Sequence, residues 1–467
     1  MAISFTKLAY GNSNDNYANG VIDQISDNAA SPTIDLAVVT GLPFDPQNPE
    51  PLGGDPRVLG FTDGSGNERA LVINYNYSGW DPGTAEFGIF DPSTTPWTSV
   101  AVRTNTQWSK LTNPYGIARL DNANMFVADY DGGLIDKITL TNYAEVLTGG
   151  NAFYTFPVVS GNTAHCAGIG VYDGKIVALF NQGQGYSSYI ASTLAIINPS
   201  DGSAVYLGPT SNNPNASGLG ANALGLTVDG GYAYVSSYGG PQQGGGNAAS
   251  KVEAVNLSNL TIVGTTSSSA GDLGDFVSTA VNGTDAYVLR ASYTASYDQY
   301  DYKIYKTTTA DLQAGTVDLT DYFLLGQEPP NAGDESYPGV TWLLAYANGR
   351  LWAVLGDRIA GIDPATPGID WQRVAYTDTS TTPATANTLG YYSTQTPPIA
   401  DHINTAAVVQ TNVPAPTVTR GVTRGAPAAP SYSVSNRGAQ HPAFISRTPE
   451  ALALRKKLIE EWKKNKK

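Results

Sequence analysis

The sequence predicts an all-β fold made of repeated hairpin units, and three observations support that prediction. A pattern of short apolar run, tight turn and second β-forming run recurs six times. The turns follow one another at intervals of 58, 52, 56, 53 and 66 positions, the period of a radial or stacked repeat. The chain has 50 Gly and 29 Pro with only 14% charged residues, as expected for many short strands joined by turns. The turn residues are Asp63, Asp121, Asp173, Asp229, Asn282 and Asn348. The predicted fold is a β-propeller.

Each copy of the pattern reads as an antiparallel hairpin, because Asp and Asn tolerate the positive φ that tight hairpin turns need. A β-sandwich array is the alternative, but its repeats would be about 100 residues long. In chain order the hairpins span Val58–Ile73, Gly116–Ala128, Gly168–Leu179, Gly225–Val235, Val277–Leu289 and Trp342–Val354.

The two ends of the repeat region predict how the ring closes. Strand-like runs occur at Ile3–Leu8 and Ile34–Thr40, and another occurs at Trp371–Tyr376. Joining both termini in one composite blade would remove the open sheet edges. The sequence therefore favours seven blades within residues 1–380, with six as the alternative.

Beyond the repeats the chain changes character. Residues 1–401 carry a net charge of −22 and residues 402–467 a net charge of +8, which together give −14. The range 381–447 is rich in Pro, Ala, Thr and Ser, which predicts an extended linker. The range 448–467 predicts a short basic amphipathic helix.

This C-terminal arm is expected to bind protein partners, either other copies of the chain or another component of an assembly. A helix that folds back on its own propeller is the plainer alternative. The acidic body is not expected to bind nucleic acid, because like charges repel. The basic tail could bind nucleic acid or a membrane surface. The apolar stripe would be Leu454, Leu458 and Trp462, flanked by Arg455, Lys456 and Lys463.

One position per blade suggests a polar ring at a channel mouth. Counting back seven or eight residues from the turns reaches Asp55, Asn113, His165, Asn222 and Asp275. This ring resembles the metal site of the calcium-dependent lactonase and streptogramin-lyase type of propeller. The resemblance implies a Ca²⁺ site with the histidine as a general base. The structural alternative is that these side chains only cap the local backbone, and that the protein uses no cofactor.

Other chemistry is sparse in the sequence. Cys166 is the only cysteine, so an internal disulfide is excluded, and the Asp129–Gly133 cluster reads as a solvated turn. No secretory signal and no membrane-spanning apolar stretch is seen. These observations are compatible with a location in a virion or appendage or in the cytoplasm. They are also compatible with the extracellular surface if a signal is missing from this chain.

The hairpin pattern over about residues 50–370 resembles the YVTN/NHL-like propeller superfamily. Fold alone decides little about function. The sequence favours a non-enzymatic structural protein, a rigid acidic propeller carried into a larger assembly by its basic arm. The alternative is a divalent-metal-dependent propeller hydrolase or lyase with its site at the channel mouth.

Overall fold

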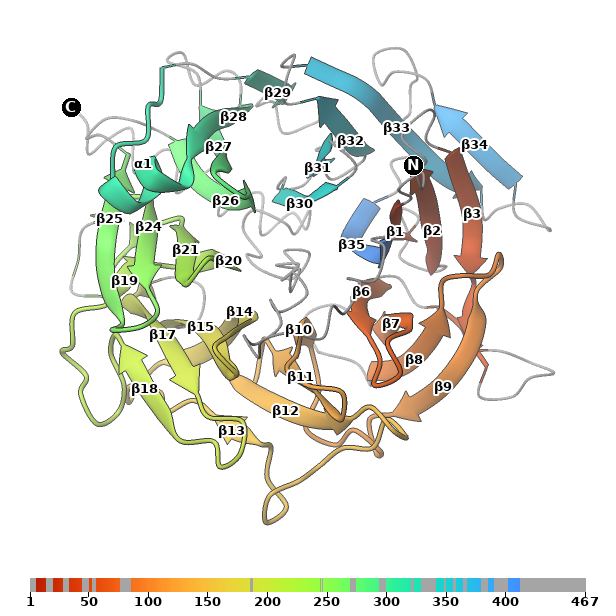
Figure 1. The fold of residues 1–467 in the computed structure, drawn as a ribbon, viewed down its shortest axis with the longest axis horizontal. Helices are drawn as coiled ribbons and strands as arrows, with labels where there is room; N and C mark the ends of the chain where they lie inside the picture. Colours follow the sequence, from red (N-terminus) through yellow and green to blue (C-terminus); the bar gives the residue numbers. More distant parts are fainter. Residues whose placement is uncertain are drawn as a thin grey trace, which may run out of the picture.

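The fold is a ring of antiparallel sheets around a central axis, and the β-propeller prediction is confirmed (Figure 1). We analysed a computed structural model. It describes residues 6–13, 20–27, 33–43, 50–52, 56–75, 85–184, 188–243, 245, 247–268, 274–293, 300–320, 323–328, 342–347, 350–355, 358–363, 368–378, 385–389 and 402–411.

The first four blades follow one another along the chain, each ordered from the inner to the outer strand. Blade 1 contains β6 (Arg57–Thr62), β7 (Glu68–Tyr75), β8 (Ala85–Asp91) and β9 (Thr98–Thr104). Blade 2 contains β10 (Pro114–Arg119), β11 (Asn124–Asp129), β12 (Leu134–Thr139) and β13 (Tyr154–Thr155). Blade 3 contains β14 (Thr163–Tyr172), β15 (Lys175–Gln184), β17 (Ala191–Ile197) and β18 (Ala204–Leu207). Blade 4 contains β20 (Ala223–Asp229), β21 (Tyr232–Ser237), β24 (Lys251–Asn256) and β25 (Thr261–Ser267).

The remaining blades complete the ring. Blade 5 contains β26 (Gly274–Asn282), β27 (Asp285–Tyr293), β28 (Tyr300–Thr308) and β29 (Phe323–Glu328). Blade 6 contains β30 (Trp342–Ala347), β31 (Arg350–Leu355), β32 (Arg358–Asp363), β33 (Gly368–Asp378) and β34 (Thr385–Leu389). Blade 7 contains β35 (His402–Thr411), β1 (Thr6–Ser13), β2 (Gly20–Asp27) and β3 (Thr33–Val39).

Short elements decorate this ring. The short strands are β4 (Gly41–Leu42), β5 (Glu50–Pro51), β16 (Ser188–Tyr189), β19 (Leu219–Ala221), β22 (Gly240–Pro241) and β23 (Asn247–Ala248). Helix α1 (Thr309–Ala314) begins with a capping box between Thr308 and Asp311 and packs on β25. Within the described ranges, no helix is long and apolar enough to cross a membrane.

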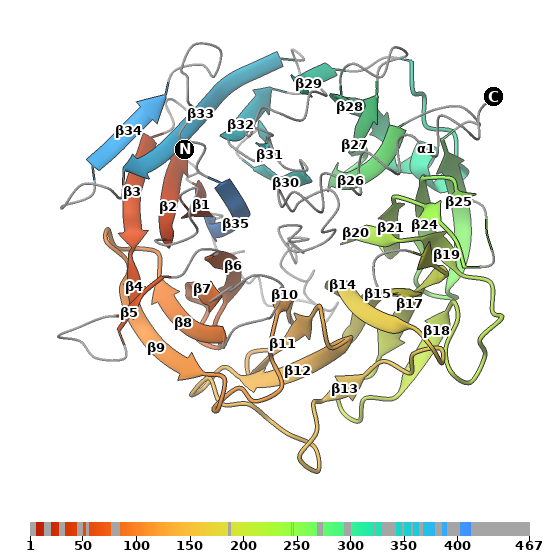
Figure 2. The ribbon, with the colours of Figure 1, turned by 180° about the vertical axis from the view of Figure 1, so that it is seen from behind.

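Ring closure differs in detail from the sequence-based expectation. Blade 7 is composite, as predicted, but its inner strand is β35, which pairs with β1. Residues Trp371–Tyr376 instead belong to β33 of blade 6. Strands β34 and β35 both lie inside the range 381–447 for which the sequence predicted a linker. Pairing a C-terminal strand with an N-terminal one closes the ring (Figure 2). The predicted helix 448–467 and the whole binding set Leu454, Arg455, Lys456, Leu458, Trp462 and Lys463 lie outside the described residues.

The inner strands touch in an unbroken circle. The contacts run in the order β6, β10, β14, β20, β26, β30, β35 and back to β6. The described residues thus form seven sheets of four or more strands around one axis. Apolar side chains between neighbouring blades form the core, and Trp108 and Trp352 are among its fully buried members.

The tight hairpin turns lie at one end of the disc in the blades where contacts place them. A Cβ on Gly64 in the first turn would lie 2.1 Å from the carbonyl oxygen of Asn122 in the second. At the third turn, Asp173 and Gly174 both have positive φ, as predicted. At the fourth, Gly230 and Gly231 take the positive φ values while Asp229 remains in the strand. Asn348 lies outside the described residues.

Candidate functional site at the channel mouth

A repeated β-bulge defines equivalent positions in the inner strands. In six blades the pairing between the inner strand and its neighbour shifts by one residue at the same place. Blade 1, among the described pairings, has no such shift between β6 and β7. Two residues before the bulge, the chain has Asn113, His165, Asn222, Asp275, Trp342 and His402. The four described ring residues from the sequence analysis therefore occupy one equivalent position, and Asp55 lies outside the described residues.

The structure joins two of these residues through a polar network that crosses three blades. The Arg57 guanidinium Nη1 donates to Asn113 Oδ1 at 2.5 Å. Asn113 Nδ2 donates to Asp131 Oδ2 at 2.8 Å. Asp131 Oδ1 lies 3.9 Å from His165 Nδ1. Arg57, Asn113 and His165 are all buried, whereas the Asp131 side chain is one-third exposed. We call these four residues the mouth network.

The backbone of the mouth network is held by Asp129 at the end of β11. Its carboxylate accepts hydrogen bonds from the backbone N–H groups of Thr112, Asn113 and Gly132 at 2.5 to 3.0 Å. Burial raises the pKa of Asp129, and these N–H donors act against that shift. The Asp129–Gly133 cluster, expected to be a solvated turn, is therefore an anchored loop that presents Asp131 to blade 3.

His165 lies against an aromatic surface. Its ring stacks on Tyr130 with 4.5 Å between centroids, and Tyr130 in turn lies 5.0 Å from Tyr115. Tyr115 is the bulge residue of blade 2 and belongs to a buried cluster with the bulge residues Ala167 and Leu224 of blades 3 and 4. Burial lowers the pKa of His165, while the Asp131 carboxylate acts to raise it. Burial thus favours the neutral form of this imidazole.

Asn222 and Asp275 occupy the same position further round the ring. Asn222 is buried with φ of 55°, and its carbonyl accepts from Tyr238 N–H at 3.1 Å. Asn113 makes the matching bond to Tyr130 N–H at 2.9 Å. Asp275 is partly exposed on β26. A main-chain hydrogen bond at this position thus repeats between blades 2 and 4, and it is made by the backbone carbonyls rather than by the side chains.

The described residues do not fit a metal ion ligated through Asn113. Asn113 Oδ1, the oxygen that a cation would need, already accepts from the Arg57 guanidinium. A divalent ion there would face a fixed positive charge. Within the described ranges, no group of three or more His, Cys, Asp or Glu side chains is arranged to hold a metal.

The sequence analysis missed Arg57, and it interpreted the Asp129–Gly133 cluster that contains Asp131 as a solvated turn. Arg57 lies between the apolar residues Pro56 and Val58. Its position two residues after the ring residue Asp55 could have indicated that it belongs to the site. Asp131 lies in the loop after β11, at the same end of the blade as the ring position. This placement could have indicated that Asp131 belongs to the site.

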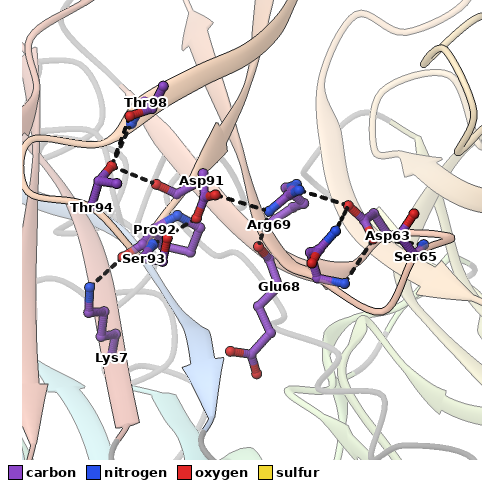
Figure 3. Close-up of polar contacts among 11 residues, drawn as sticks. Lys7, Asp63, Ser65, Glu68, Arg69, Asp91, Pro92, Ser93, Thr94 and Thr98 are labelled. Carbon is purple, nitrogen blue, oxygen red and sulfur yellow. Dashed lines mark hydrogen bonds and ion pairs between the residues drawn. The ribbon is translucent and has the colours of Figure 1, made fainter.

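A second polar network joins blades 7 and 1 away from the mouth (Figure 3). The buried Lys7 on β1 donates to the carbonyl oxygen of Pro92. Arg69 lies 3.4 Å from Asp91 Oδ2 and 3.0 Å from Asp63 Oδ2. Burial lowers the pKa of Lys7, with Asp35 and Asp91 opposing that shift. The positive charges of Lys7 and Arg69 lie near the carboxylates of Asp63 and Asp91 within this junction. We therefore interpret the second polar network as a structural link between the two blades.

Comparisons with known proteins indicate the fold. No protein-family model matches the chain, and no curated protein matches it. Among solved structures, a "putative 6-phosphogluconolactonase" from Bacteroides fragilis shares 13% identity over 78% of this chain and 93% of its own, with a TM-score of 0.45. A calcium-binding protein, regucalcin, from Agrobacterium tumefaciens shares 13% identity over 65% and 82%, with a TM-score of 0.35. The Cps50 (Swd1) β-propeller domain from Myceliophteria thermophila shares 10% over 68% and 88%, with a TM-score of 0.35.

The prediction of a non-enzymatic structural protein is corrected by these findings. One of the three similar structures is described as a "putative 6-phosphogluconolactonase". The channel mouth also holds a buried histidine beside a carboxylate. The alternative from the sequence was a divalent-metal-dependent hydrolase or lyase, and a metal ligated through Asn113 does not fit. At this level of similarity the comparisons show the fold alone: the chain is a β-propeller.

Proposed function

We propose that the protein is a hydrolase or lyase that acts on a small polar substrate at the channel mouth. The observation that supports this proposal most strongly is the mouth network, in which the buried His165 lies 3.9 Å from the partly exposed Asp131. Buried titratable groups that are gathered from several elements are typical of reaction centres.

His165 would accept the substrate proton. Burial favours the neutral imidazole, in which one ring nitrogen carries no proton and can accept one. With Nδ1 facing Asp131, a proton on Nδ1 leaves Nε2 as the accepting atom. The Asp131 carboxylate would then stabilise the imidazolium that forms after proton transfer.

Arg57 and Asn113 would hold the rest of the centre in place. The bond from Arg57 fixes which side of the Asn113 amide carries the donor. Asn113 Nδ2 therefore donates to Asp131 and sets the orientation of that carboxylate. The guanidinium also supplies positive potential to an otherwise acidic chain, which favours negative charge that develops on a substrate oxygen.

The test is turnover of a substrate panel of activated esters, lactones, amides and β-hydroxy acids by the purified full-length protein. For any substrate that reacts, His165→Gln should lower kcat/KM by roughly 100-fold or more. In the wild type, kcat/KM should fall as the pH drops through the lowered pKa of His165. Adding EDTA should leave the rate unchanged.

The matched control is Asp173→Asn, which changes an exposed turn residue on β14–β15 and should retain full activity. Full activity of His165→Gln, or no turnover of any substrate class, would contradict the proposal.

A further inference from the structure

Asn181 on β15 has a buried polar atom that the fold does not satisfy. The residue is 1% exposed. Its side-chain oxygen Oδ1 accepts no hydrogen bond from the described part of the chain. Buried amide oxygens in folded proteins nearly always have a partner, so an unpaired one calls for an explanation such as a ligand or an ordered water.

The orientation of the Asn181 amide follows from its other end. Nδ2 lies 3.4 Å from the carbonyl oxygen of Ala223 and donates to it. Turning the amide over would place its oxygen against that carbonyl oxygen, which is repulsive. Oδ1 is therefore the unpaired atom, and it can only accept a hydrogen bond.

The position of Asn181 connects it to the mouth network. In the pairing of β14 with β15, Asn181 is directly opposite His165. Residues paired in this way are cross-strand neighbours on one face of a sheet. Ala223, the partner of Asn181 Nδ2, follows the ring residue Asn222 in blade 4. The polar residues at the mouth thus continue from Arg57 in blade 1 to the edge of blade 4.

The next residue on β15 shows the contrast. Gln182 is also fully buried, but its side chain is satisfied at both ends. Its Oε1 accepts from Val159 N–H at 2.9 Å, and its Nε2 donates to Pro209 O at 2.9 Å. The fold therefore supplies partners to a buried amide where the amide is structural.

We propose that Asn181 Oδ1 accepts a hydrogen bond from a hydroxyl or amide N–H of the substrate and makes Asn181 a specificity-determining residue. This inference rests on the proposed function, since it takes the mouth network as the reaction centre. A substrate that lacks the donor would leave the acceptor buried and unpaired, and a site of this kind discriminates strongly against such an analogue.

The first arm of the test is stability. Asn181→Leu replaces the unpaired amide with an apolar side chain of similar size. The thermal midpoint should stay unchanged or rise, because only one long hydrogen bond is lost. The matched control Gln182→Met should lower the midpoint, because it leaves Val159 N–H unpaired and removes one of the two donors to Pro209 O. A fall for Asn181→Leu as large as that for Gln182→Met would show a structural amide and overturn the proposal.

The second arm is binding, measured by ligand-observed NMR without any catalysis. The probes are three monoanions. Propanoate carries no hydrogen-bond donor, lactate carries a hydroxyl, and N-acetylglycinate carries an amide N–H. We expect at least one of the last two to bind tenfold or more tightly than propanoate. Tighter binding of lactate would indicate a hydroxyl donor, and tighter binding of N-acetylglycinate would indicate an amide donor. Asn181→Leu should abolish the preference, and Gln182→Met should retain it.

Equal binding of the three probes, including no binding of any, would overturn the proposal, as would a preference that survives in Asn181→Leu. Failure of the proposed function is a separate result. It would appear as full activity of His165→Gln on the substrate panel, whatever the probes do.

Discussion

Asp136 on β12 is a buried carboxyl group that shares its surroundings with a second one. It is fully buried, and neither of its oxygens has a hydrogen-bond partner of normal geometry among the described residues. The neighbouring Glu145 carboxylate accepts from Ser109 N–H at 2.9 Å and from Lys110 N–H at 2.9 Å in the connection between blades 1 and 2. Burial, and then the neighbouring Glu145, raise the pKa of Asp136 to about 8. The pair is thus expected to share one proton at neutral pH.

This pair predicts a pH-dependent stability. The pKa of Asp136 is higher in the folded than in the unfolded chain, so its contribution falls as the pH rises from about 4 to about 8. Asp136→Asn removes this titration. Relative to wild type, the variant should gain about 1–3 kcal/mol in unfolding free energy between pH 5 and pH 9.

Urea unfolding at the two pH values measures this gain, with Asp173→Asn at an exposed turn as the control. A difference between Asp136→Asn and wild type that does not change with pH would show that the carboxyl pair does not hold a proton.

The sequence located part of the candidate site for a physical reason. Asn113, His165, Asn222 and Asp275 recur seven or eight residues before the hairpin turns, because the bulge repeats in their inner strands. Asp131 could not be found this way, because it comes from a loop of a neighbouring blade, and loops do not share the repeat. Asn181 was missed because an unpaired acceptor is a property of packing and not of pattern.

At the scale of the elements, β35 has the largest consequence. The sequence predicted a composite closing blade correctly but assigned its C-terminal strand to Trp371–Tyr376. That run has the apolar and aromatic residues of a strand, and it is one, yet it pairs within blade 6. The strand that closes the ring, His402–Thr411, lies within a region whose composition is that of a linker. Composition averaged over a long window hid a ten-residue strand.

The closing strand predicts how the chain tolerates truncation. A chain that ends after Thr411 retains β35 and should fold to a stable propeller. A chain that ends before His402 loses the inner strand of blade 7, which exposes the edge of β1 and removes the contacts that β35 makes with β6 and β30 in the neighbouring blades. It should lose cooperative unfolding or aggregate.

Circular dichroism melting of the two truncated chains beside the full chain measures the difference. A stable, monomeric propeller from the chain that ends before His402 would contradict the assignment of β35 as the closing strand.

At the scale of the whole molecule, the two ends of the disc differ. One end carries tight turns, such as Asp173–Gly174, that bring neighbouring blades together. The other end carries the ring position and, within the described ranges, connecting residues 130–133, 188–190 and 247–250. Rigid strands thus bring side chains from separate blades together at one mouth. Next to them lies the buried cluster that contains the bulge residues Tyr115, Ala167 and Leu224. A propeller can position a reactive group in this way on rigid strands.

The central claim of this account is that His165 is a neutral proton acceptor at the mouth, held beside Asp131. The most direct test is an NMR titration of the histidine imidazoles in the full-length protein, which has only 3 histidines. His165→Gln assigns the resonance. The pKa of His165 should lie below 6.5, because burial disfavours the imidazolium, and Asp131→Asn should lower it further by removing the opposing carboxylate. A pKa of His165 above 6.5, or one that Asp131→Asn leaves unchanged, would contradict the account.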